Sequence, residues 1–284
     1  MIALTGATGQ LGRLVIDRLL ATLPAADIVA AVRTPSKAAD LASRGIQVRQ
    51  ADYTNPTSLD QAFAGVDKLL LISSSEVGQR ATQHRNVIDA AKRQHVGLLV
   101  YTSLLHADTS LLNLADEHRE TEALLRASGI PFIILRNGWY TENYTASLAP
   151  ALANGAFYGS AGTGLIASAA RADYAEAAAK ALTGAAQVGR TYELAGDHAY
   201  TLADLAAELS RQTGKAIPYV NIPEADYSAA LSAAGLPGWL AAGLASWDTA
   251  ASRGALFDDS HQLSALLGHP TTPLSDAVSL ALRS

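Results

Sequence analysis

The fold is decided by the opening stretch Met1-Ile2-Ala3-Leu4-Thr5-Gly6-Ala7-Thr8-Gly9-Gln10-Leu11-Gly12. The apolar run at 2–4 predicts a buried parallel strand, and the amphipathic run at 11–23 predicts a helix. Between them stand three glycines with the spacing Gly-x-x-Gly-x-x-Gly. A strand, a tight turn and a helix in this order are typical of the first unit of a dinucleotide-binding fold.

Each glycine of this turn has its own physical task. Gly6 can adopt backbone conformations that side chains forbid, Gly9 lets a pyrophosphate approach the main chain, and Gly12 lets the helix pack close to the strand. The first amides of the helix then face the phosphates with the positive end of the helix dipole. An ordinary strand-to-helix turn is the alternative, and the context disfavours it. We therefore expect a phosphate cradle made of Gly6, Ala7, Thr8, Gly9, Gln10, Leu11 and Gly12.

The composition is that of a well-packed globular protein. The 284 residues suffice for one large α/β domain, or for a core domain with a small appendage. Apolar residues make up 49% of the chain and charged residues 17%, which argues against disorder. The formal net charge is −5 and no block of Lys or Arg occurs, so we expect no nucleic-acid partner.

The chain contains no cysteine, which excludes disulfides, thiolate catalysis and cysteine-held metal sites. We expect no metal. No apolar stretch is long enough to span a bilayer, so we expect no membrane insertion. The N-terminus lacks a basic leader, and cleavage there would remove the glycine turn. These observations favour a cytoplasmic protein.

Strand-like and helix-like segments alternate through the first half of the chain, which predicts an α/β fold with a Rossmann doubly wound parallel sheet. Near-continuous apolar strands indicate burial on both faces of that sheet. Further strands are expected at 28–32, from Val48 onward, and at 68–72, 98–102 and 132–135, with helices at 35–42, 58–64, 80–93 and 115–128.

The second half is less regular and predicts a small, mostly helical C-terminal substrate lobe. Thr201 and Gly214 bracket a helix as its N-cap and its terminating glycine. We expect a NADP(H)-binding Rossmann domain at 1–150 and a smaller substrate-binding lobe at 151–284, from which segments near 165–200 return to the Rossmann core. Other helices are expected at 175–182, 224–234 and 236–245, and a strand at 191–195.

The end of the second strand indicates which nucleotide binds. NAD-preferring sites place an acidic residue there to accept from the ribose hydroxyls. This chain has Arg33 instead, and Lys37 follows one turn later. A guanidinium presents a planar fork suited to a phosphate, so we expect NADP(H). The alternative is a solvated surface arginine.

Polar residues follow the third and fourth strands at the carboxyl edge, where open α/β sheets bind ligands. Asp52 and Tyr53 stand where an adenine rests, and Asp52 can accept from its amino group. Ser73, Ser74 and Ser75 offer small hydroxyls to phosphate or ribose. A plain polar loop is an equally good interpretation of the serines.

The sixth expected strand is followed by Asn137-Gly138-Trp139-Tyr140. An amide next to a glycine and two aromatic rings predicts a wall beside the nicotinamide. The alternative is an ordinary turn with two half-buried rings.

The helix after the fifth strand lacks a catalytic pair. Short-chain dehydrogenases that reduce carbonyls usually carry Tyr-x-x-x-Lys there, and our alignment puts Leu114 and His118 at those two positions. Leucine cannot donate a proton, so ordinary alcohol dehydrogenase chemistry is not expected. His118 either contacts the cofactor or is solvated on the helix.

Several long segments carry a family resemblance that covers nearly the whole chain. They are 1–12, Val48-Arg49-Gln50-Ala51-Asp52-Tyr53, Ser73-Ser74-Ser75-Glu76-Val77-Gly78-Gln79-Arg80, residues 101–110, Leu135-Arg136-Asn137-Gly138-Trp139-Tyr140 and residues 254–260. The chain resembles the type 2 family of NADPH-dependent quinone oxidoreductases, which are NmrA-like atypical short-chain dehydrogenases/reductases. Triphenylmethane dye reductases share the fold and the opening glycines but lack the Ser73-to-Glu76 version of the loop, so they rank second.

The resemblance implies hydride transfer from NADPH to a quinone, giving the hydroquinone in one two-electron step without flavin. A quinone accepts hydride readily, and positioning matters more than acid catalysis. This accounts for the absent tyrosine.

The resemblance also implies site residues. We expect His106, Asn137 and Tyr140 to be catalytic, and His106, Tyr140, Asn143 and Tyr144 to line the quinone pocket. Flat rings suit a flat substrate, and Tyr140 and Tyr144 would share one helix face. A loop histidine without a role is an equal alternative for His106. On the cofactor we expect Arg33, Asp52, Tyr53, Ser73, Ser74, Ser75, Asn137, Gly138, Trp139, Tyr140, Thr141, Glu142 and Arg171, with Asp173 as a helix N-cap.

Two other functions remain open. An NmrA-like regulatory protein would sense NADP(H) without catalysis, and a triphenylmethane or azo dye reductase would use another acceptor. A nucleotide-sugar epimerase is disfavoured by the absent tyrosine and the small lobe. We expect a monomer or a homodimer whose partner molecule is a small quinone.

Overall fold

The structure is a computed structural model that describes residues 1–283. Within them, a seven-stranded sheet runs in the order β3-β2-β1-β4-β5-β6-β8, and every pair in it is parallel. Its strands are β1 (Ile2–Thr5), β2 (Ile28–Val32), β3 (Gln47–Gln50), β4 (Lys68–Leu71), β5 (Leu98–Leu104), β6 (Phe132–Asn137) and β8 (Thr191–Leu194).

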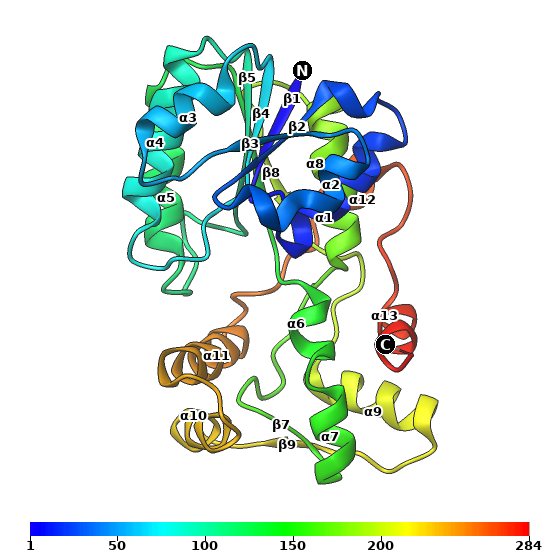
Figure 1. Cartoon of the computed structure of the whole chain (residues 1–284). Helices are drawn as coiled ribbons and strands as arrows, with labels where there is room; N and C mark the ends of the chain where they lie inside the picture. Colours follow the sequence, from blue (N-terminus) through cyan, green and yellow to red (C-terminus); the bar gives the residue numbers. More distant parts are fainter. Residues whose placement is uncertain (284) are drawn as a thin grey trace.

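Helices cover both faces of this sheet (Figure 1). The strand β1 shows the cause, because Ala3 packs into one hydrophobic cluster and Leu4 into another on the opposite face. The Leu4 face carries α1 (Gln10–Leu20), α8 (Arg171–Thr183) and α12 (Gln262–Leu267), and the Ala3 face carries α3 (Pro56–Phe63), α4 (Arg80–Arg93) and α5 (Ala115–Ala127). The short elements η1 (Ala25–Asp27), η2 (Pro35–Ala38) and α2 (Ala39–Ser43) flank β2.

A helical lobe lies beyond the carboxyl edge of the sheet (Figure 1). It has its own cluster of buried residues, which includes Trp139, Leu148 and Leu205. A two-stranded parallel sheet, β7 with β9, lies within it. The lobe contains α6 (Thr141–Thr145), α7 (Leu148–Asn154), β7 (Phe157–Gly159), α9 (Leu202–Thr213), β9 (Tyr219–Asn221), α10 (Glu224–Ala233), α11 (Gly238–Ala251) and α13 (Leu274–Ala281).

The α/β fold class is confirmed, and so is the expected helix α9. The Thr201 hydroxyl accepts from the Asp204 amide, and Asp204 accepts in return from the Thr201 amide, which forms a capping box. Gly214 ends the helix with φ +69°. The division of the chain at residue 150 stays a prediction, although α8 and β8 do lie in the sheet layers.

The expectation that Asp173 is a helix N-cap is wrong. Helix α8 starts two residues earlier, at Arg171, with Ala170 as its N-cap. Asp173 instead accepts from the amide and hydroxyl of Thr272, both at 2.9 Å. This buried carboxylate therefore fastens the C-terminal segment to the sheet half.

Candidate functional site

The glycine turn after β1 has the geometry of a phosphate cradle. Gly6 lies at φ +61°, which favours glycine, and its carbonyl accepts from the Gly9 amide at 2.9 Å. A Cβ on Gly12 would come within 2.3 Å of the Gly6 carbonyl oxygen and 2.8 Å of the Ala7 Cα. Only glycine therefore lets α1 approach the turn this closely.

The N-terminus of α1 faces this turn and has no side-chain cap among the described residues. Its N-cap, Gly9, has no side chain to offer. Unpaired helical amides and the positive end of the dipole form an anion site. The residues present therefore fit the pyrophosphate of a dinucleotide.

Arg33 stands just past the end of β2, as expected, and its side chain is mostly exposed. Its guanidinium donates to Glu76 Oε1 at 2.8 Å. Glu76 belongs to the loop after β4, and β1 lies between β2 and β4, so the pair reaches across the end of β1 at the carboxyl edge of the sheet. The cation expected for the phosphate already has one carboxylate partner.

Asp52 and Tyr53 are placed at the expected edge, with their polar atoms engaged by the protein. The amide and hydroxyl of Thr54 donate to Asp52 Oδ1 at 2.8 and 2.7 Å and hold the pKa of that carboxyl below its usual range. The Tyr53 hydroxyl donates to the Ile72 carbonyl at 3.1 Å. Their roles toward an adenine stay predictions.

The serine loop is anchored from beneath by a buried histidine. The Ser74 amide donates to His84 Nε2 at 2.9 Å, and His84 Nδ1 contacts the Thr121 hydroxyl at the same distance. Burial, with the charge of Arg80, lowers the pKa of His84 to about 3. The ring is therefore neutral, and Nε2 is the acceptor that fixes the loop.

His118 is not solvated, so that alternative is wrong. Its side chain is buried on α5, and Nδ1 contacts the Tyr101 hydroxyl at 2.7 Å. Burial lowers its pKa to about 3 as well. Leu114, at the position of the missing tyrosine, packs against the lobe cluster. Neither residue can supply the proton that a catalytic tyrosine would.

The end of β6 offers an unpaired acceptor. Asn137 is buried, and its Oδ1 has no hydrogen-bond partner among the described residues. A buried polar atom without a partner is costly, and an amide donor such as a carboxamide would satisfy it. Gly138 keeps the following turn tight, because a Cβ there would lie 3.0 Å from the Leu194 carbonyl oxygen.

Tyr140 is enclosed by α8. The Arg171 guanidinium lies over its ring at 4.8 Å from the centroid, and the Tyr174 ring meets it edge-on at 5.3 Å. Burial raises the pKa of Tyr140 above its ordinary value, against the opposing effects of Asn137 and Arg171. The hydroxyl is therefore neutral at physiological pH.

Thr141 and Glu142 begin α6. The Thr141 hydroxyl contacts Ser168 Oγ at 2.8 Å. Both oxygens of Glu142 accept from the Arg171 amide, at 2.9 and 3.0 Å. Glu142 thus caps α8 from a neighbouring element and fixes Arg171 at the edge of the site.

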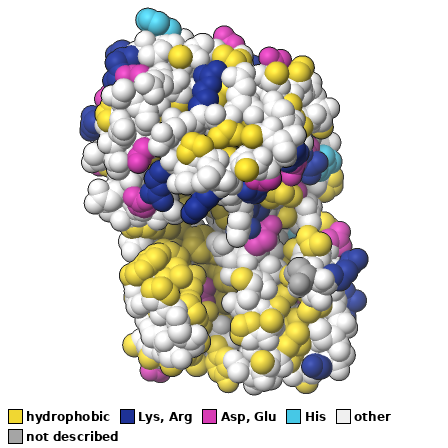
Figure 2. Space-filling model, viewed as in Figure 1, with side chains coloured by type: hydrophobic (Ala, Val, Ile, Leu, Met, Phe, Trp, Pro, Cys, Tyr) yellow, Lys and Arg dark blue, Asp and Glu magenta, His cyan; other side chains and the backbone are white. Residues whose placement is uncertain are grey.

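A cavity of about 840 Å³ connects the sheet edge with the lobe. On the sheet side it reaches Gln10 and Arg171, and its polar wall includes Glu142 and Asn143. Figure 2 shows the hollow between the two halves, with hydrophobic side chains gathered on the lobe beside it. Its other lining residues are Trp139, Thr145, Ala146, Leu148, Ala149, Leu152, Leu240, Leu244, Trp247, Ala281 and Leu282.

Sequence reasoning missed the wall that α11 supplies. Leu240, Leu244 and Trp247 are spaced i, i+4 and i+7, which places them on one helix face. The Trp247 ring meets Trp139 edge-on at 5.6 Å, and its Nε1 donates to Asn113 Oδ1 at 2.9 Å. The spacing of these three apolar residues can be read from the sequence, but the sequence does not show that this helix face points toward the glycine turn.

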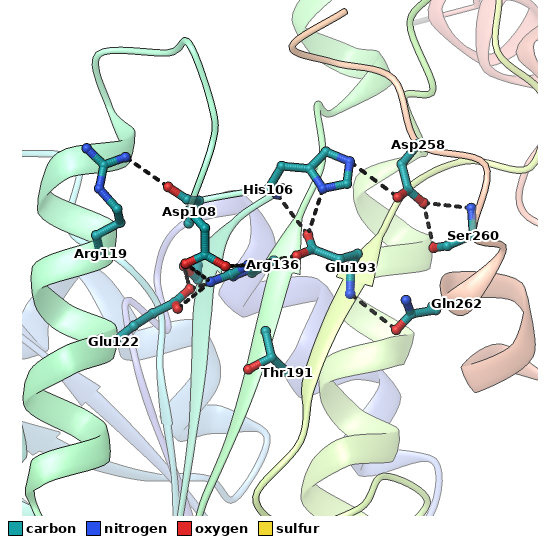
Figure 3. A network of polar contacts seen from close by, with 12 residues as sticks. His106, Asp108, Arg119, Glu122, Arg136, Thr191, Glu193, Asp258, Ser260 and Gln262 are labelled. Atoms are coloured by element: carbon teal, nitrogen blue, oxygen red, sulfur yellow. Dashed lines mark hydrogen bonds and ion pairs between the residues drawn. The ribbon is translucent and has the colours of Figure 1, made fainter.

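Of the four residues expected in the quinone pocket, Asn143 lines the cavity, whereas His106, Tyr140 and Tyr144 do not. His106 Nε2 lies 3.3 Å from Asp258 and 3.2 Å from the Phe257 carbonyl, and Nδ1 lies 3.7 Å from Glu193 (Figure 3). The Tyr144 hydroxyl donates to Asp248 at 3.2 Å in the lobe core. Tyr140 and Tyr144 thus contact different elements, α8 and α11.

The glycine cradle, the uncapped helix and the unpaired Asn137 oxygen define the class: a dinucleotide-binding protein of the Rossmann type. Residues 6–185 match the NAD(P)H-binding family. The chain is 61% identical to Quinone oxidoreductase 2 of Escherichia coli strain K12 over 279 residues, which are 98% of each chain. The chain belongs to this NAD(P)H-binding family of NmrA-like oxidoreductases, which confirms the resemblance.

Solved structures agree. The NADPH-dependent quinone oxidoreductase of Escherichia coli complexed with NADPH superimposes with a TM-score of 0.97 at 61% identity, covering 99% of this chain and 100% of that one. The Citrobacter triphenylmethane reductase complexed with NADP(H) gives 0.96 at 38% identity, with the same coverage. Among residues 1–283, no helix could cross a membrane, and no cluster of His, Cys, Asp or Glu could hold a metal ion.

Proposed function

We propose that the protein is an NADPH:quinone oxidoreductase that works without flavin. The observation that carries this proposal is the cavity, which joins the dinucleotide side of the sheet edge, at Gln10 and Arg171, to an apolar wall with Trp139 and Trp247. A flat conjugated acceptor suits a wall of aromatic rings. The 61% identity to Quinone oxidoreductase 2 over nearly the full chain supports the same acceptor.

The geometry supports the following roles for the cofactor residues. Residues 6–12 hold the pyrophosphate through backbone amides, and Arg33 meets the 2′-phosphate. Asn137 Oδ1 accepts from the carboxamide and so orients the nicotinamide ring. When bound, NADPH supplies the hydride. The remaining expected contacts, which we keep in this proposal, are Asp52, Tyr53, Ser73, Ser74, Ser75, Gly138, Trp139, Tyr140, Thr141, Glu142 and Arg171.

On the acceptor side, the protein contributes positioning of the quinone rather than an acid that protonates it. Asn143 and Trp139 line the cavity next to Glu142, so they orient a quinone against the cofactor. Because Tyr140 is neutral and the Tyr-Lys pair is missing, we assign no strong proton donor among residues 1–283 to this site. Hydroquinone oxygens are far more acidic than alcohols, so water can complete their protonation. Holding two flat rings in contact is then the main contribution of the protein.

His106 and Tyr144 support the site from behind. Tyr144 donates to Asp248 and so ties α6 to α11, two helices that line the cavity. His106 joins the loop after β5 to Asp258, outside the cavity lining. We propose that Tyr144 holds the walls of the cavity, that His106 holds the loop after β5, and that neither touches the quinone.

The test is a turnover assay with NADPH and 1,4-benzoquinone, followed by the absorbance of the reduced cofactor. Sustained, protein-dependent oxidation of NADPH supports the proposal, and a triphenylmethane dye as second acceptor measures selectivity. Binding of one NADPH per chain without turnover would contradict catalysis and favour a sensor. We also propose that the enzyme works in the cytoplasm as a monomer or homodimer, which gel filtration and cell fractionation test.

Asn137→Ala and Tyr140→Ala locate the site. We expect either change to raise the Michaelis constant for quinone or to depress turnover by about tenfold, the size of one lost hydrogen bond or ring contact. Normal kinetics in both variants would remove these residues from the site.

A further inference from the structure

The Arg33–Glu76 pair places an anion where the 2′-phosphate of the cofactor is expected. Glu76 Oε1 accepts from the Arg33 guanidinium at 2.8 Å. The carboxylate is held from the other side as well, because Glu76 Oε2 accepts from the buried Gln83 amide at 2.7 Å. Glu76 is therefore positioned by the protein and does not reach Arg33 by chance.

Glu76 is the carboxylate that contacts Arg33. Asp52 also feels the Arg33 charge: the amide and hydroxyl of Thr54 lower the pKa of Asp52 most, and Arg33 lowers it further. Two carboxylates therefore interact with one exposed cation. A dianionic phosphate that binds Arg33 must displace Glu76 or share the cation with it. A ribose hydroxyl carries no charge, so NADH can bind while Glu76 stays paired with Arg33.

We propose that Glu76 is a specificity-determining residue, which competes with the 2′-phosphate of NADPH for Arg33 and so reduces the preference of the site for NADPH over NADH. The inference rests on the proposed function, since it concerns the same cofactor site. In this proposal Glu76, in the loop after β4, opposes the effect that Arg33, at the end of β2, has on the preference for NADPH.

Glu76→Gln is the informative change. It removes the charge but keeps the size, and the new amide can still pair with Gln83, whose Oε1 has no partner among the described residues. Glu120→Gln is the matched control, because Glu120 is an exposed glutamate that faces Arg85 at 3.7 Å on the outer helices. Both variants lose one negative charge.

The experiment measures the dissociation constants of NADPH and NADH by quenching of tryptophan fluorescence, since Trp139 and Trp247 line the cavity. We expect Glu76→Gln to tighten NADPH binding about two- to fivefold, the range of one exposed ion pair. NADH binding should stay within about twofold, and Glu120→Gln should change neither. In an Arg33→Ala background the Glu76→Gln effect should vanish, because the contested cation is gone.

Weaker NADPH binding by Glu76→Gln would overturn the proposal, because it would mean that Glu76 holds Arg33 ready for the phosphate. Equal tightening of both nucleotides would also overturn it. If the glutamine variant folds poorly, Glu76→Ala, which also removes the charge, gives a second measurement of the same effect on NADPH binding. A wild-type chain that binds neither nucleotide would overturn the proposed function as well, whereas one that binds NADPH and ignores the substitution overturns this inference alone.

Discussion

Two buried charges, one in each half of the molecule, are stabilised in opposite ways. Arg136 on β6 donates to Glu122, Asp108 and Glu193, with five contacts of 2.7–2.8 Å (Figure 3). Asp248 on α11 accepts only from the Tyr144 hydroxyl and the Ser160 amide among described residues, at 3.2 and 3.0 Å. The sheet half compensates charge with charge, while the lobe uses neutral dipoles.

The difference shows in their acid-base behaviour. The three carboxylates outweigh the burial of Arg136 and raise its pKa. Burial raises the pKa of Asp248 to about 6, against the opposing hydrogen bonds from Ser160 and Tyr144. The lesson is that a fully paired cation fixes the sheet edge rigidly, whereas a carboxylate without a counterion makes the lobe sensitive to pH.

Arg136→Met should cause the largest loss of stability among these variants. It removes the cation that the three carboxylates share and leaves only Glu122 with a second arginine, Arg126, so the free energy of unfolding should fall by about 3–5 kcal/mol. Urea unfolding at pH 7 measures this loss. Arg85→Met, which removes an exposed arginine, is the control and should cost under about 1 kcal/mol. Similar losses for both would mean that the Arg136 network does not stabilise the fold.

Asp248→Asn tests whether the buried carboxylate of the lobe makes stability depend on pH. Its folded pKa of about 6 lies above the unfolded value near 4, so the wild type loses stability as pH rises between these values. Asparagine keeps the shape without the charge, and should raise the free energy of unfolding by about 3 kcal/mol at pH 8 and by nothing near pH 3.5. Urea unfolding at both values tests this. A pH-independent difference would refute the assignment.

Arg33→Ala tests a third kind of charge in the molecule, an exposed cation with a single hydrogen-bond partner among the described residues. We expect the dissociation constant for NADPH to rise about tenfold, with NADH changed less than about twofold. The free energy of unfolding should not change, because the side chain is exposed. An unchanged preference for NADPH would remove Arg33 from the cofactor site.

His106→Asn should give the smallest effect. His106 has φ +51°, which asparagine tolerates better than most residues. Loss of its ring contacts to Asp258 and Phe257 should lower the free energy of unfolding by less than about 1 kcal/mol, with the Michaelis constant for quinone within about twofold. Steady-state kinetics and urea unfolding, measured on the same preparation, test both expectations. A tenfold fall in turnover would instead make His106 catalytic.

Much of the sheet half could be predicted because its signals are local. The glycine turn, the strand 28–32 and the helix 80–93 depend on spacing and periodicity, and the structure reproduces them. Arg33 could be placed at the sheet edge because parallel strands share one carboxyl end. The same reasoning could not show that Glu76 meets it from the loop after β4, two strands away in the sheet.

The lobe side of the cavity could not be predicted for a physical reason. Its walls come from the consecutive helices α6 and α7 and from α11 and α13 much later in the sequence, which meet only through tertiary packing. His106 and Tyr144 were expected to face the substrate from their ring types and their positions near the sheet edge, yet their side chains contact Asp258 and Asp248 instead. Residue type indicates chemistry, but direction depends on distant neighbours.

The path of the chain between the halves has a practical consequence. The polypeptide passes from one half to the other after β6, β7, β8, α11 and α12. Neither half is therefore a continuous stretch of gene that could be excised and expressed alone. Removal of the last two helices would strip α12 from the sheet and α13 from the lobe in one cut. Protein engineers who want a different acceptor should exchange single side chains on α11 and leave the lobe in place.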